Sequence, residues 1–280
     1  MHIQIILYNS DRFIEKLILG LNLLNNKSKI IVHFWDNSNQ NLQEKILSLS
    51  PNFAFTYDIS ETNLGFGIAH NKIFEKYKKD YDKYFIVANH DSLPFDDAIT
   101  NLNEFISDYG ENTGAVELTQ FPSEHPKEYD QLTFETEWVS GAFTCFSKDI
   151  YNEINGFDEN IFMYCEDVDI SWRILQIGKK ILHCPYSKIC HITQSFDLQK
   201  NSDFEQIHSL AGNAYLRFKY ISDDFAHNYL QLLKHLSNYN QIEKVYLSSA
   251  TKLTTDELLN FRKFTSPAFY TDTNYARHRW

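Results

Sequence analysis

The stretch FDENIFMYCEDVDISWR, residues 157–173, sets an acidic cluster at the start of an amphipathic helix. Three carboxylates crowd the first turn of that helix: Glu166, Asp167 and Asp169. Its apolar residues recur at helical spacing and form a buried face: Ile170, Ile174 and Ile177. One acidic residue there gains only about 0.3–1 kcal/mol from the helix dipole, and Asp169 can also pair with Arg173 one turn later. An isolated cluster of this kind is more often structural, but three carboxylates repel one another, and the rest of the chain favours an active site.

Length and charge limit the classes of protein that fit. The chain has 280 residues, which suits one large α/β domain or one domain with an extension, and allows a sizeable core. Its net charge of −11 offers no basic surface to a nucleic-acid duplex, so we expect no nucleic acid as partner. A ligand that carries phosphate would need a metal ion or local hydrogen-bond donors on such an acidic protein.

The sequence contains no recognisable signal for export or membrane insertion. Residues 1–8 lack a basic stretch and form too short an apolar run for a signal peptide, and no later run is long enough to span a membrane. We therefore expect a cytoplasmic protein. The tail, residues 277–280, leaves open a peripheral contact with the inner face of the membrane. We expect the cysteines to be reduced, because none has CxxC spacing: Cys145, Cys165, Cys184 and Cys190.

Short apolar runs alternate with helical patterns through the first half of the chain. The predicted strands are residues 3–7, 30–35, 53–57, 84–88 and 114–118. The predicted helices between them are residues 13–24, 42–49, 69–77 and 95–109. This alternation is typical of a mostly parallel sheet covered by helices on both faces. Beyond it we predict an extended stretch, a strand and three helices: residues 133–146, 181–184, and 204–220, 225–236 and 255–264.

Polar residues follow the carboxyl end of each of the first four strands. They are Asn9 and Ser10, residues 36–38, residues 61–63 and residues 89–91. Ligands on parallel α/β sheets bind at the carboxyl ends of the strands, so these residues are expected to converge on one crevice. Polar loops are common after strands and explain any single segment, whereas the joint pattern favours a binding site.

The segment NLGFGIAHN, residues 63–71, contains two glycines in a turn. It lacks the third glycine of a dinucleotide-binding fingerprint and follows the third strand instead of the first, so it is weak evidence for NAD. We interpret it as a turn that brings backbone close to a nucleotide, with Asn63 and Asn71 supplying hydrogen bonds. The alternative is a helix start capped near Gly67.

Two residues have the chemistry of a divalent-metal site. Asp91 follows a buried strand, where its carboxylate can hold Mg²⁺ or Mn²⁺ bridging a diphosphate. His191 lies in a segment that returns toward the same edge, and imidazole suits Mn²⁺. A lone Asp after a strand is usually a turn former and a lone His is usually structural, so these alternatives stay open.

Eight short segments, taken in order, resemble family 2 inverting glycosyltransferases, above all the rhamnosyltransferase-like and galactofuranosyltransferase-like members. The segments are residues 8–9, 36–38, 63–67, 89–91, 140–142, 156–159, 166–169 with Arg173, and His191. The resemblance covers about residues 2–196, and its part from Gly141 to His191 is the most specific.

This resemblance implies a GT-A fold, in which an α/β domain that binds a nucleotide-sugar is joined to an acceptor-binding region. Residues 1–200 would form the catalytic domain, with residues 1–118 as its donor-binding half and 119–200 as its acceptor-binding and catalytic half. Residues 201–280 would form a mostly helical C-terminal extension packed on it.

The resemblance also implies roles for individual residues. Asp167 matches the catalytic base, with Glu166 as its acidic neighbour. The implied donor-binding residues are Tyr8, Asn9, Asp36, Asn63, Gly65, Asn71, Asn89, His90 and Asp91. The implied acceptor-binding residues are Trp138, Ser140, Gly141, Asp169 and Arg173. Asp91 and His191 match metal ligands, although Asn89 stands at the first position of the family's DxD-type motif.

The implied reaction moves a hexosyl or deoxyhexosyl group from a nucleoside-diphosphate-sugar to a hydroxyl of a glycan or lipid-linked glycan, with Mn²⁺ or Mg²⁺ as cofactor. Bacterial surface polysaccharide synthesis is the implied setting, and a homo-oligomer stays open. The alternative is a non-catalytic nucleotide-sugar-binding protein of the same fold, although neither Asp167 nor Asp91 is lost. A nucleotidyltransferase or a dehydrogenase would need a glycine-rich phosphate loop after the first strand, and residues 8–11 have none.

Overall fold

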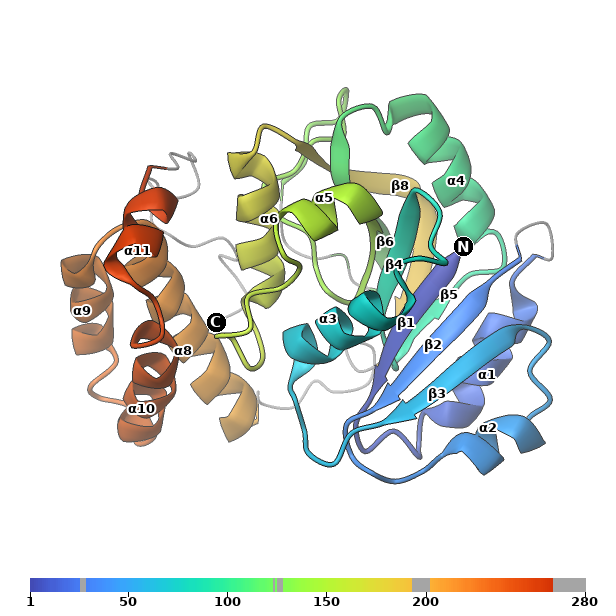
Figure 1. Ribbon diagram of the computed structural model, residues 1–280, viewed down its shortest axis with the longest axis horizontal. Helices are drawn as coiled ribbons and strands as arrows, with labels where there is room; N and C mark the ends of the chain where they lie inside the picture. The colour runs from blue at the N-terminus through green and yellow to red at the C-terminus, as the bar shows by residue number, and fades with distance from the viewer. Residues whose placement is uncertain (26–28, 123, 125–127, 193–201, 264–280) are drawn as a thin grey trace.

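The computed structural model describes residues 1–25, 29–122, 124, 128–192 and 202–263, and Figure 1 shows an α/β sheet beside a group of C-terminal helices. Eight strands form one sheet in the order β3-β2-β1-β4-β7-β6-β8-β5. Their bounds are β1 His2–Leu7, β2 Ile31–Asp36, β3 Ala54–Ile59, β4 Tyr84–Asn89, β5 Ser92–Pro94, β6 Thr113–Phe121, β7 Phe143–Ser147 and β8 Lys180–His191. Strands β3, β2, β1 and β4 are parallel, as are β6 and β8, whereas β7 and β5 run antiparallel to their neighbours. The predicted mixed, mostly parallel sheet is confirmed.

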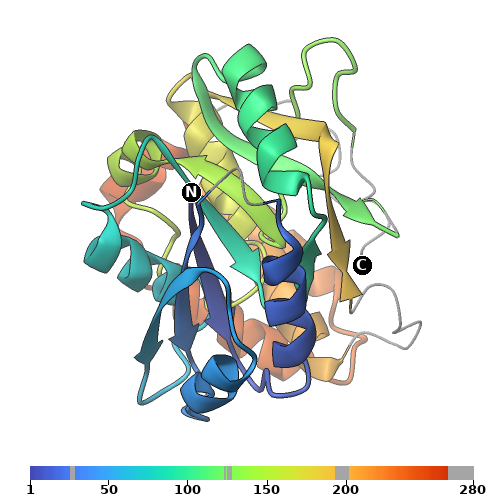
Figure 2. The same ribbon diagram turned by 90° about the vertical axis from the view of Figure 1, so that its right-hand side faces the viewer.

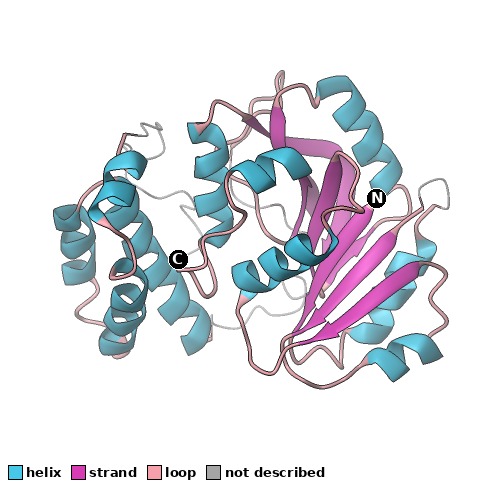
Figure 3. Cartoon of the chain, in the orientation of Figure 1, coloured by secondary structure: helices cyan, strands magenta, loops and turns pink. Residues whose placement is uncertain are grey.

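Helices cover both faces of the sheet (Figure 3). One face carries α1 Ile14–Leu23, α2 Gln43–Ser48 and α4 Ala98–Tyr109, and Figure 2 looks toward α1 and α4 on this side. The other face carries α3 Phe66–Tyr77, α5 Lys148–Glu153 and α6 Glu166–Gln176. Successive strand residues point to opposite faces, so Ile86 packs in the first core and its neighbours Phe85 and Val87 pack in the second.

Four helices lie within the described residues 202–263: α8 Asp203–Tyr220, α9 Asp223–Leu232, α10 Tyr239–Ala250 and α11 Thr255–Phe261. Helices α8, α9 and α10 share an apolar cluster of their own. Leu216 and Tyr220 of α8 also pack against Trp172 of α6, and Phe261 of α11 packs against the same group. The predicted boundary at residue 200 and the tail 277–280 lie outside the described residues, so the division into domain and extension stays a prediction. No helix within the described ranges has the length and apolarity that a membrane crossing requires.

Strand β8 is much longer than predicted and carries the site's histidine. The sequence pattern indicated a strand over 181–184, whereas β8 runs over 12 residues. Its pairing with β6 shifts between Leu118 and Thr119, where residues 185–187 are passed over as a bulge. Pro185 interrupts the strand pattern at this point because it has no N–H, and a bulge tolerates it. Three further elements, β5, α5 and α10, were not predicted.

Candidate active site

Asp91 and His191 meet at the edge of the sheet. Asp91 lies between β4 and β5, and the antiparallel pairing of Ser92 with His191 brings the end of β8 beside it. The His191 Nε2 atom lies 3.4 Å from the Asp91 carboxylate, and the two side chains are only 11% and 8% exposed. The fold therefore places side by side the two residues that the resemblance matched to metal ligands.

Gln120 of β6 orients the ring of His191. The Nδ1 atom of the ring lies 3.0 Å from Gln120 Oε1, and Gln120 Nε2 donates to Glu117 Oε1 at 3.4 Å. With the amide assigned in this orientation, Gln120 accepts the Nδ1 proton and the Nε2 lone pair of a neutral imidazole points toward Asp91. A carboxylate oxygen beside an imidazole nitrogen held in this way suits Mn²⁺.

Asp91 and His191 therefore fit a divalent ion at this edge of the sheet, but the ion would need further ligands. Within the described ranges, no group of three or more His, Cys, Asp or Glu side chains is arranged to hold a metal. A divalent cation of this kind usually takes about six ligands and keeps several waters or substrate oxygens. Diphosphate and water oxygens would have to complete the shell that Asp91 and His191 begin.

The turn at Asn63–Gly65 lies against the loop that leads to the acidic helix. Gly65 has φ +77°, and a Cβ there would lie 2.1 Å from the Phe162 carbonyl oxygen, so only glycine fits. The Phe66 N–H donates to that same oxygen at 3.1 Å, and Asn63 Oδ1 accepts from Gly65 N at 2.9 Å. The predicted donor turn is thus joined to the segment that ends in Asp167.

The other residues predicted to bind donor at the strand ends differ in exposure. Tyr8 is 46% exposed, and Asn9 beside it is exposed with φ +49°. Asn89 ends β4, where its N–H donates to the Ala142 carbonyl at 2.9 Å. His90 packs on Phe13 with ring centroids 4.9 Å apart, and burial lowers its pKa below the usual range. His90 is therefore neutral at pH 7.

Asp36 and Asn71 hold the protein's own loops. Asp36 is fully buried, and its carboxylate accepts hydrogen bonds from Ser38, Asn41 and Tyr57 at 2.7–2.9 Å. The Asn71 amide donates to the Phe157 carbonyl at 2.9 Å, and its oxygen accepts from Phe157 N and from the Tyr151 hydroxyl. These contacts with the protein's own loops occupy both side chains, and the donor-binding role of Asp36 and Asn71 stays a prediction.

Asp167 lies in the first turn of α6 with its carboxylate held by main-chain groups. Two consecutive residues before the helix, Tyr164 and Cys165, have φ of +65° and +71°, a costly backbone for side chains of this kind. The Asp167 Oδ2 atom accepts from Gly141 N at 3.2 Å, and Oδ1 accepts from Val168 N at 2.9 Å. Glu166 beside it is 6% exposed. The tight turn places Asp167 next to Gly141, just before strand β7.

Segment 140–142 connects the acidic helix to the end of β4. Gly141 donates to Asp167, and Ala142 accepts from Asn89, two residues before Asp91. A Cβ on Gly141 would meet the Phe66 ring at 3.1 Å, so this position favours glycine. Ser140 is buried and bonds within its own turn, where its oxygens accept from Ala142 N and Thr144 Oγ1. The structure therefore places the candidate base and the candidate metal ligands on one connected support.

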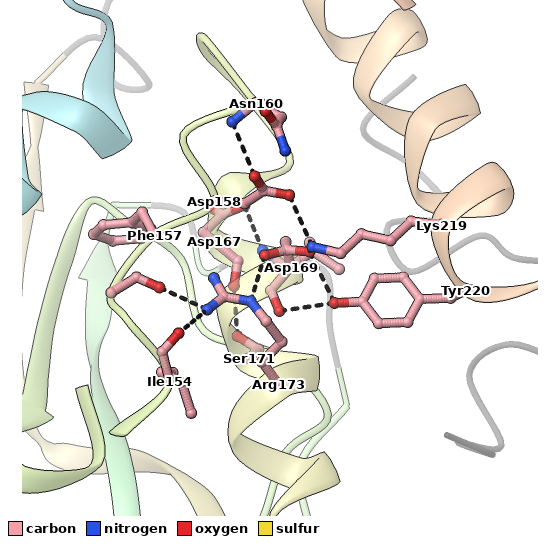
Figure 4. A network of polar contacts seen from close by, with 12 residues as sticks. Ile154, Phe157, Asp158, Asn160, Asp167, Asp169, Ser171, Arg173, Lys219 and Tyr220 are labelled. Atoms are coloured by element: carbon pink, nitrogen blue, oxygen red, sulfur yellow. Dashed lines mark hydrogen bonds and ion pairs between the residues drawn. The ribbon is translucent and has the colours of Figure 1, made fainter. Parts of the chain in front are cut away.

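Asp169 and Arg173 are buried inside the protein instead of facing an acceptor (Figure 4). Arg173 Nε donates to Asp169 Oδ2 at 2.7 Å, and its NH1 donates to the carbonyls of Ile154 and Gly156. Asp169 has no exposed surface. Burial alone would raise the pKa of Asp169, but the charges of Arg173 and Lys219 outweigh burial and hold it at about 2. The contacts of Asp169 and Arg173 favour a structural role, and the expectation that they bind acceptor stays a prediction.

Trp138 is also removed from the acceptor side. Its side chain is 3% exposed and packs in an apolar cluster with Val168 and Trp172 of α6 and Tyr220 of α8. A ring buried in this way cannot stack on a sugar in the described conformation. In this conformation Trp138 serves core packing, and its acceptor-binding role stays a prediction.

Two residues of this region were not found by sequence reasoning. Gln120 was missed because nothing in the order of residues relates the end of β6 to His191. Lys219, which is 1% exposed and bonds to Asp169, was missed because a lysine in a helix is normally assigned to solvent. A signal for Lys219 is its apolar and aromatic neighbourhood, since it stands between Phe218 and Tyr220.

Comparisons with known proteins agree with this fold, although no family model matches the chain. The rhamnosyltransferase WbbL of Escherichia coli (strain K12) is 26% identical over 223 residues, 68% of this chain and 83% of that protein. An N-acetylglucosaminyl-diphospho-decaprenol L-rhamnosyltransferase of Mycobacterium tuberculosis (strain ATCC 25618 / H37Rv) is 33% identical over 54 residues, 19% of this chain and 18% of that protein.

Solved structures share the fold at low identity. GalNAc-T7 with UDP, GalNAc and Mn²⁺ aligns at TM-score 0.62 and 12% identity, over 88% of this chain and 54% of that one. The mannosyltransferase PcManGT from Pyrobaculum calidifontis with GDP-Man and Mn²⁺ aligns at TM-score 0.56 and 14% identity, over 94% and 83%.

The fold and the sequence relatives together define a glycosyltransferase of the GT-A fold. Within that class the chain is similar to rhamnosyltransferases, which confirms the resemblance to family 2.

Proposed function

We propose that this glycosyltransferase moves a sugar, with inversion, from a nucleoside-diphosphate-sugar to a hydroxyl of a lipid-linked glycan in bacterial surface polysaccharide synthesis. The observation that carries the proposal is Asp167. Its carboxylate is held at the start of α6 by the Gly141 and Val168 N–H groups, and no Lys or Arg among the described residues forms an ion pair with it. A carboxylate that no cation neutralises is the kind of group that takes the proton of an acceptor hydroxyl.

The proposed reaction is a single displacement. Asp167 takes the proton of the acceptor hydroxyl as that oxygen attacks the anomeric carbon, and the bond from that carbon to the diphosphate breaks. The transition state resembles an oxocarbenium ion, as in inverting glycoside hydrolysis with the acceptor in place of water. A positioned base of this kind contributes about 10²–10⁴-fold to the rate.

Asp91 and His191 would hold the divalent ion. Bound Mn²⁺ or Mg²⁺ supplies positive charge against the leaving diphosphate, which a chain of net charge −11 otherwise repels. Gln120 keeps the Nε2 lone pair of His191 directed at the site. The two Mn²⁺-bound structures that share the fold support this role for a metal.

The donor and acceptor sides follow from the same geometry. We place the nucleotide against the Asn63–Gly65 turn and the exposed end of β1, at Tyr8 and Asn9. The name of the mycobacterial relative, which carries a diphospho-decaprenol acceptor, supports a lipid-linked acceptor here. An enzyme with such an acceptor would work at the inner face of the membrane.

A thermal-shift screen with UDP-, dTDP- and GDP-sugars, with and without Mn²⁺, tests the donor and the metal. A ligand at 100 times its Kd adds about 2.7 kcal/mol of stability. We expect a shift with one nucleotide class that requires Mn²⁺ and is lost in Asp91→Ala. The control is Asp108→Ala, which removes an exposed carboxylate from α4 and should leave the shift unchanged.

Transfer itself is then measured by mass spectrometry, with the donor so found and a synthetic lipid-diphosphate-sugar acceptor. A glycosylated product supports the proposal. Donor binding without any product would favour the non-catalytic binding protein instead.

A further inference from the structure

Lys219 of α8 is buried between two carboxylates of the catalytic region. Its Nζ atom lies 2.8 Å from Asp158 Oδ2 and 2.5 Å from Asp169 Oδ1, and its side chain is 1% exposed (Figure 4). The hydroxyl of Tyr220 donates to Asp169 Oδ1 at 2.8 Å, and that of Tyr215 donates to Asp158 Oδ2 at 2.8 Å. Three side chains of helix α8 thus make polar contacts with residues that precede or belong to α6.

The cluster is electrically balanced. Asp158 and Asp169 carry two negative charges, and Lys219 and Arg173 carry two positive charges. Burying a lysine is costly unless its charge is paired and its hydrogen bonds are made. The rings of Tyr215, Tyr220 and Phe261 also lie near the ammonium, with Phe261 of α11 at 4.2 Å. Glu257 of α11 also interacts electrostatically with Lys219.

These contacts surround the turn that positions Asp167. Arg173 donates to the carbonyls of Ile154 and Gly156, at the beginning of the loop that leads into α6. Asp158 in that loop also accepts from Asn160 N at 2.9 Å. Lys219 therefore fastens the loop through Asp158 and the first turn of α6 through Asp169. Asp167 lies between these two attachment points in sequence.

We propose that Lys219 is a positioning residue for sugar transfer, through which helix α8 sets both the placement of Asp167 and the charge around it. The inference rests on the proposed function, because it assigns the base role to Asp167. Lys219 touches no reacting atom in this scheme. It acts through Asp158 and Asp169.

The charge effect has a definite sign. Without the ammonium, Asp169 keeps only Arg173 as a cation, and the cluster carries one net negative charge two residues from Asp167. A like charge nearby raises the pKa of a carboxylate. The base would then be protonated at a higher pH, so activity would be lost earlier as the pH falls.

Transfer by the full chain at saturating Mn²⁺, measured from pH 5 to 8, tests this with Lys219→Met. We expect kcat to fall about tenfold or more with a small change in donor KM, and the acid limb of the kcat profile to move up by about half a unit to one unit. The double variant K219M/D169N restores charge balance, because Asp158 and Arg173 remain, and should return the acid limb toward the wild-type position. Lys244→Met, an exposed lysine of α10, is the control and should keep wild-type values.

A second readout does not depend on transfer. Hydrogen exchange of the amides in residues 157–167 should speed up in K219M and not in K244M, since the loop loses an attachment point. Should K219M fail to fold, Tyr220→Phe removes one hydrogen bond to Asp169 and should give a smaller drop in kcat and a shift of the acid limb in the same direction.

The outcomes of these experiments distinguish the positioning role of Lys219 from the proposed function. If the wild-type chain transfers sugar while K219M and Y220F keep its kcat and its acid limb, the positioning role is overturned and the proposed function stands. A reduced kcat with an unmoved acid limb, uncorrected by D169N, overturns the charge role. If the wild-type chain transfers nothing, the proposed function fails, and unchanged exchange in residues 157–167 then overturns the attachment as well.

Discussion

Two regions of this molecule hold buried carboxylates in opposite ways. At the junction of α6 and α8, Asp158 and Asp169 face Lys219 and Arg173 of the same chain, at 2.5–2.8 Å. At the sheet edge, Asp91 faces the Nε2 atom of His191, whose other nitrogen lies beside Gln120. The first arrangement is neutral when the chain has folded. The second combines the Asp91 carboxylate with a His191 nitrogen that Gln120 orients toward a cation. It is therefore the arrangement that suits an exchangeable metal ion.

The largest effect should come from Asp167, which is two residues from Asp169 and held by main-chain groups. We expect Asp167→Asn to lower kcat by about 10²–10⁴-fold, because the amide cannot accept the acceptor proton. The fold should be retained, since the Gly141 N–H can still donate to the amide oxygen. Initial rates together with the thermal shift on donor binding measure both properties. Undiminished transfer by this variant would exclude Asp167 as the base.

Substitution of the neighbouring Asp169 should instead lower the stability of the fold. Asp169→Ala leaves Arg173 buried without its carboxylate and Lys219 with Asp158 alone, and breaking a buried pair costs about 3–5 kcal/mol. Urea unfolding at pH 7 should show this loss, whereas Asp167→Asn should lie within about 1 kcal/mol of wild type. Equal losses in the two variants would contradict the division between a structural and a catalytic aspartate.

Gln120 offers a smaller perturbation at the sheet edge. We expect Gln120→Leu to weaken Mn²⁺ binding about 10–100-fold, because residues that orient a metal ligand contribute about this much. Titration of Mn²⁺ in the presence of the matched nucleotide, followed by calorimetry, gives the dissociation constant. Asn101→Leu, which removes an exposed hydrogen bond from α4 to the carbonyl of Tyr186, is the control. Wild-type affinity in Q120L would mean that His191 needs no support.

A buried histidine provides the smallest expected effect and extends the comparison to a neutral group. Burial lowers the pKa of His70 to about 3, and its Nδ1 lies 2.9 Å from Gln4 Oε1. The unfolded state binds the proton at about 6.5, so this contribution to stability is fully present above that pH and is lost as pH falls from 6.5 to about 3. The slope for one such group is about 1.4 kcal/mol per pH unit.

Urea unfolding at pH 7, 6 and 5 tests this, with His70→Phe as the comparison. The variant should be less stable at pH 7, since Gln4 loses its partner, and its stability should fall less steeply with acid. The carboxylate of Asp169, with its pKa at about 2, should contribute to acid unfolding only below about pH 4. If H70F leaves the slope of the free energy of unfolding against pH unchanged, groups other than His70 control the loss of stability in acid.

Much of the fold followed from local pattern. The parallel strands from β1 to β4 and the helices between them have strong periodicity, and they formed within a few residues of the predicted positions. The predicted strand ended before Pro185, because a proline normally ends a strand. In the structure β8 continues past Pro185, and the bulge that tolerates this proline depends on pairing with β6. Helix α10 was missed because its sequence mixes polar and apolar residues, and its partners are other C-terminal helices.

Part of the candidate site was also predicted from local residue patterns. Asp91 and His191 are 100 residues apart in the sequence, and their residue types and strand positions, together with the family resemblance, predicted a shared role. Asn71, Trp138 and Arg173 were given binding roles from their places in motifs. Burial and hydrogen bonding decide whether a polar or aromatic side chain meets a ligand or the protein itself, and these depend on the packing of distant segments.

The sequence by itself determined that the chain is an α/β protein with an acidic helix start and polar strand ends, because periodicity, glycine placement and residue chemistry act over a few residues. Only the tertiary structure decided which carboxylates are neutralised inside the protein. Asp167 and Asp169 are alike in type and lie in one helical turn. Their difference comes from Arg173, one turn later, and from Lys219, 50 residues from Asp169 along the chain, because charges placed 2.7 and 2.5 Å away dominate the free energy of a buried ion.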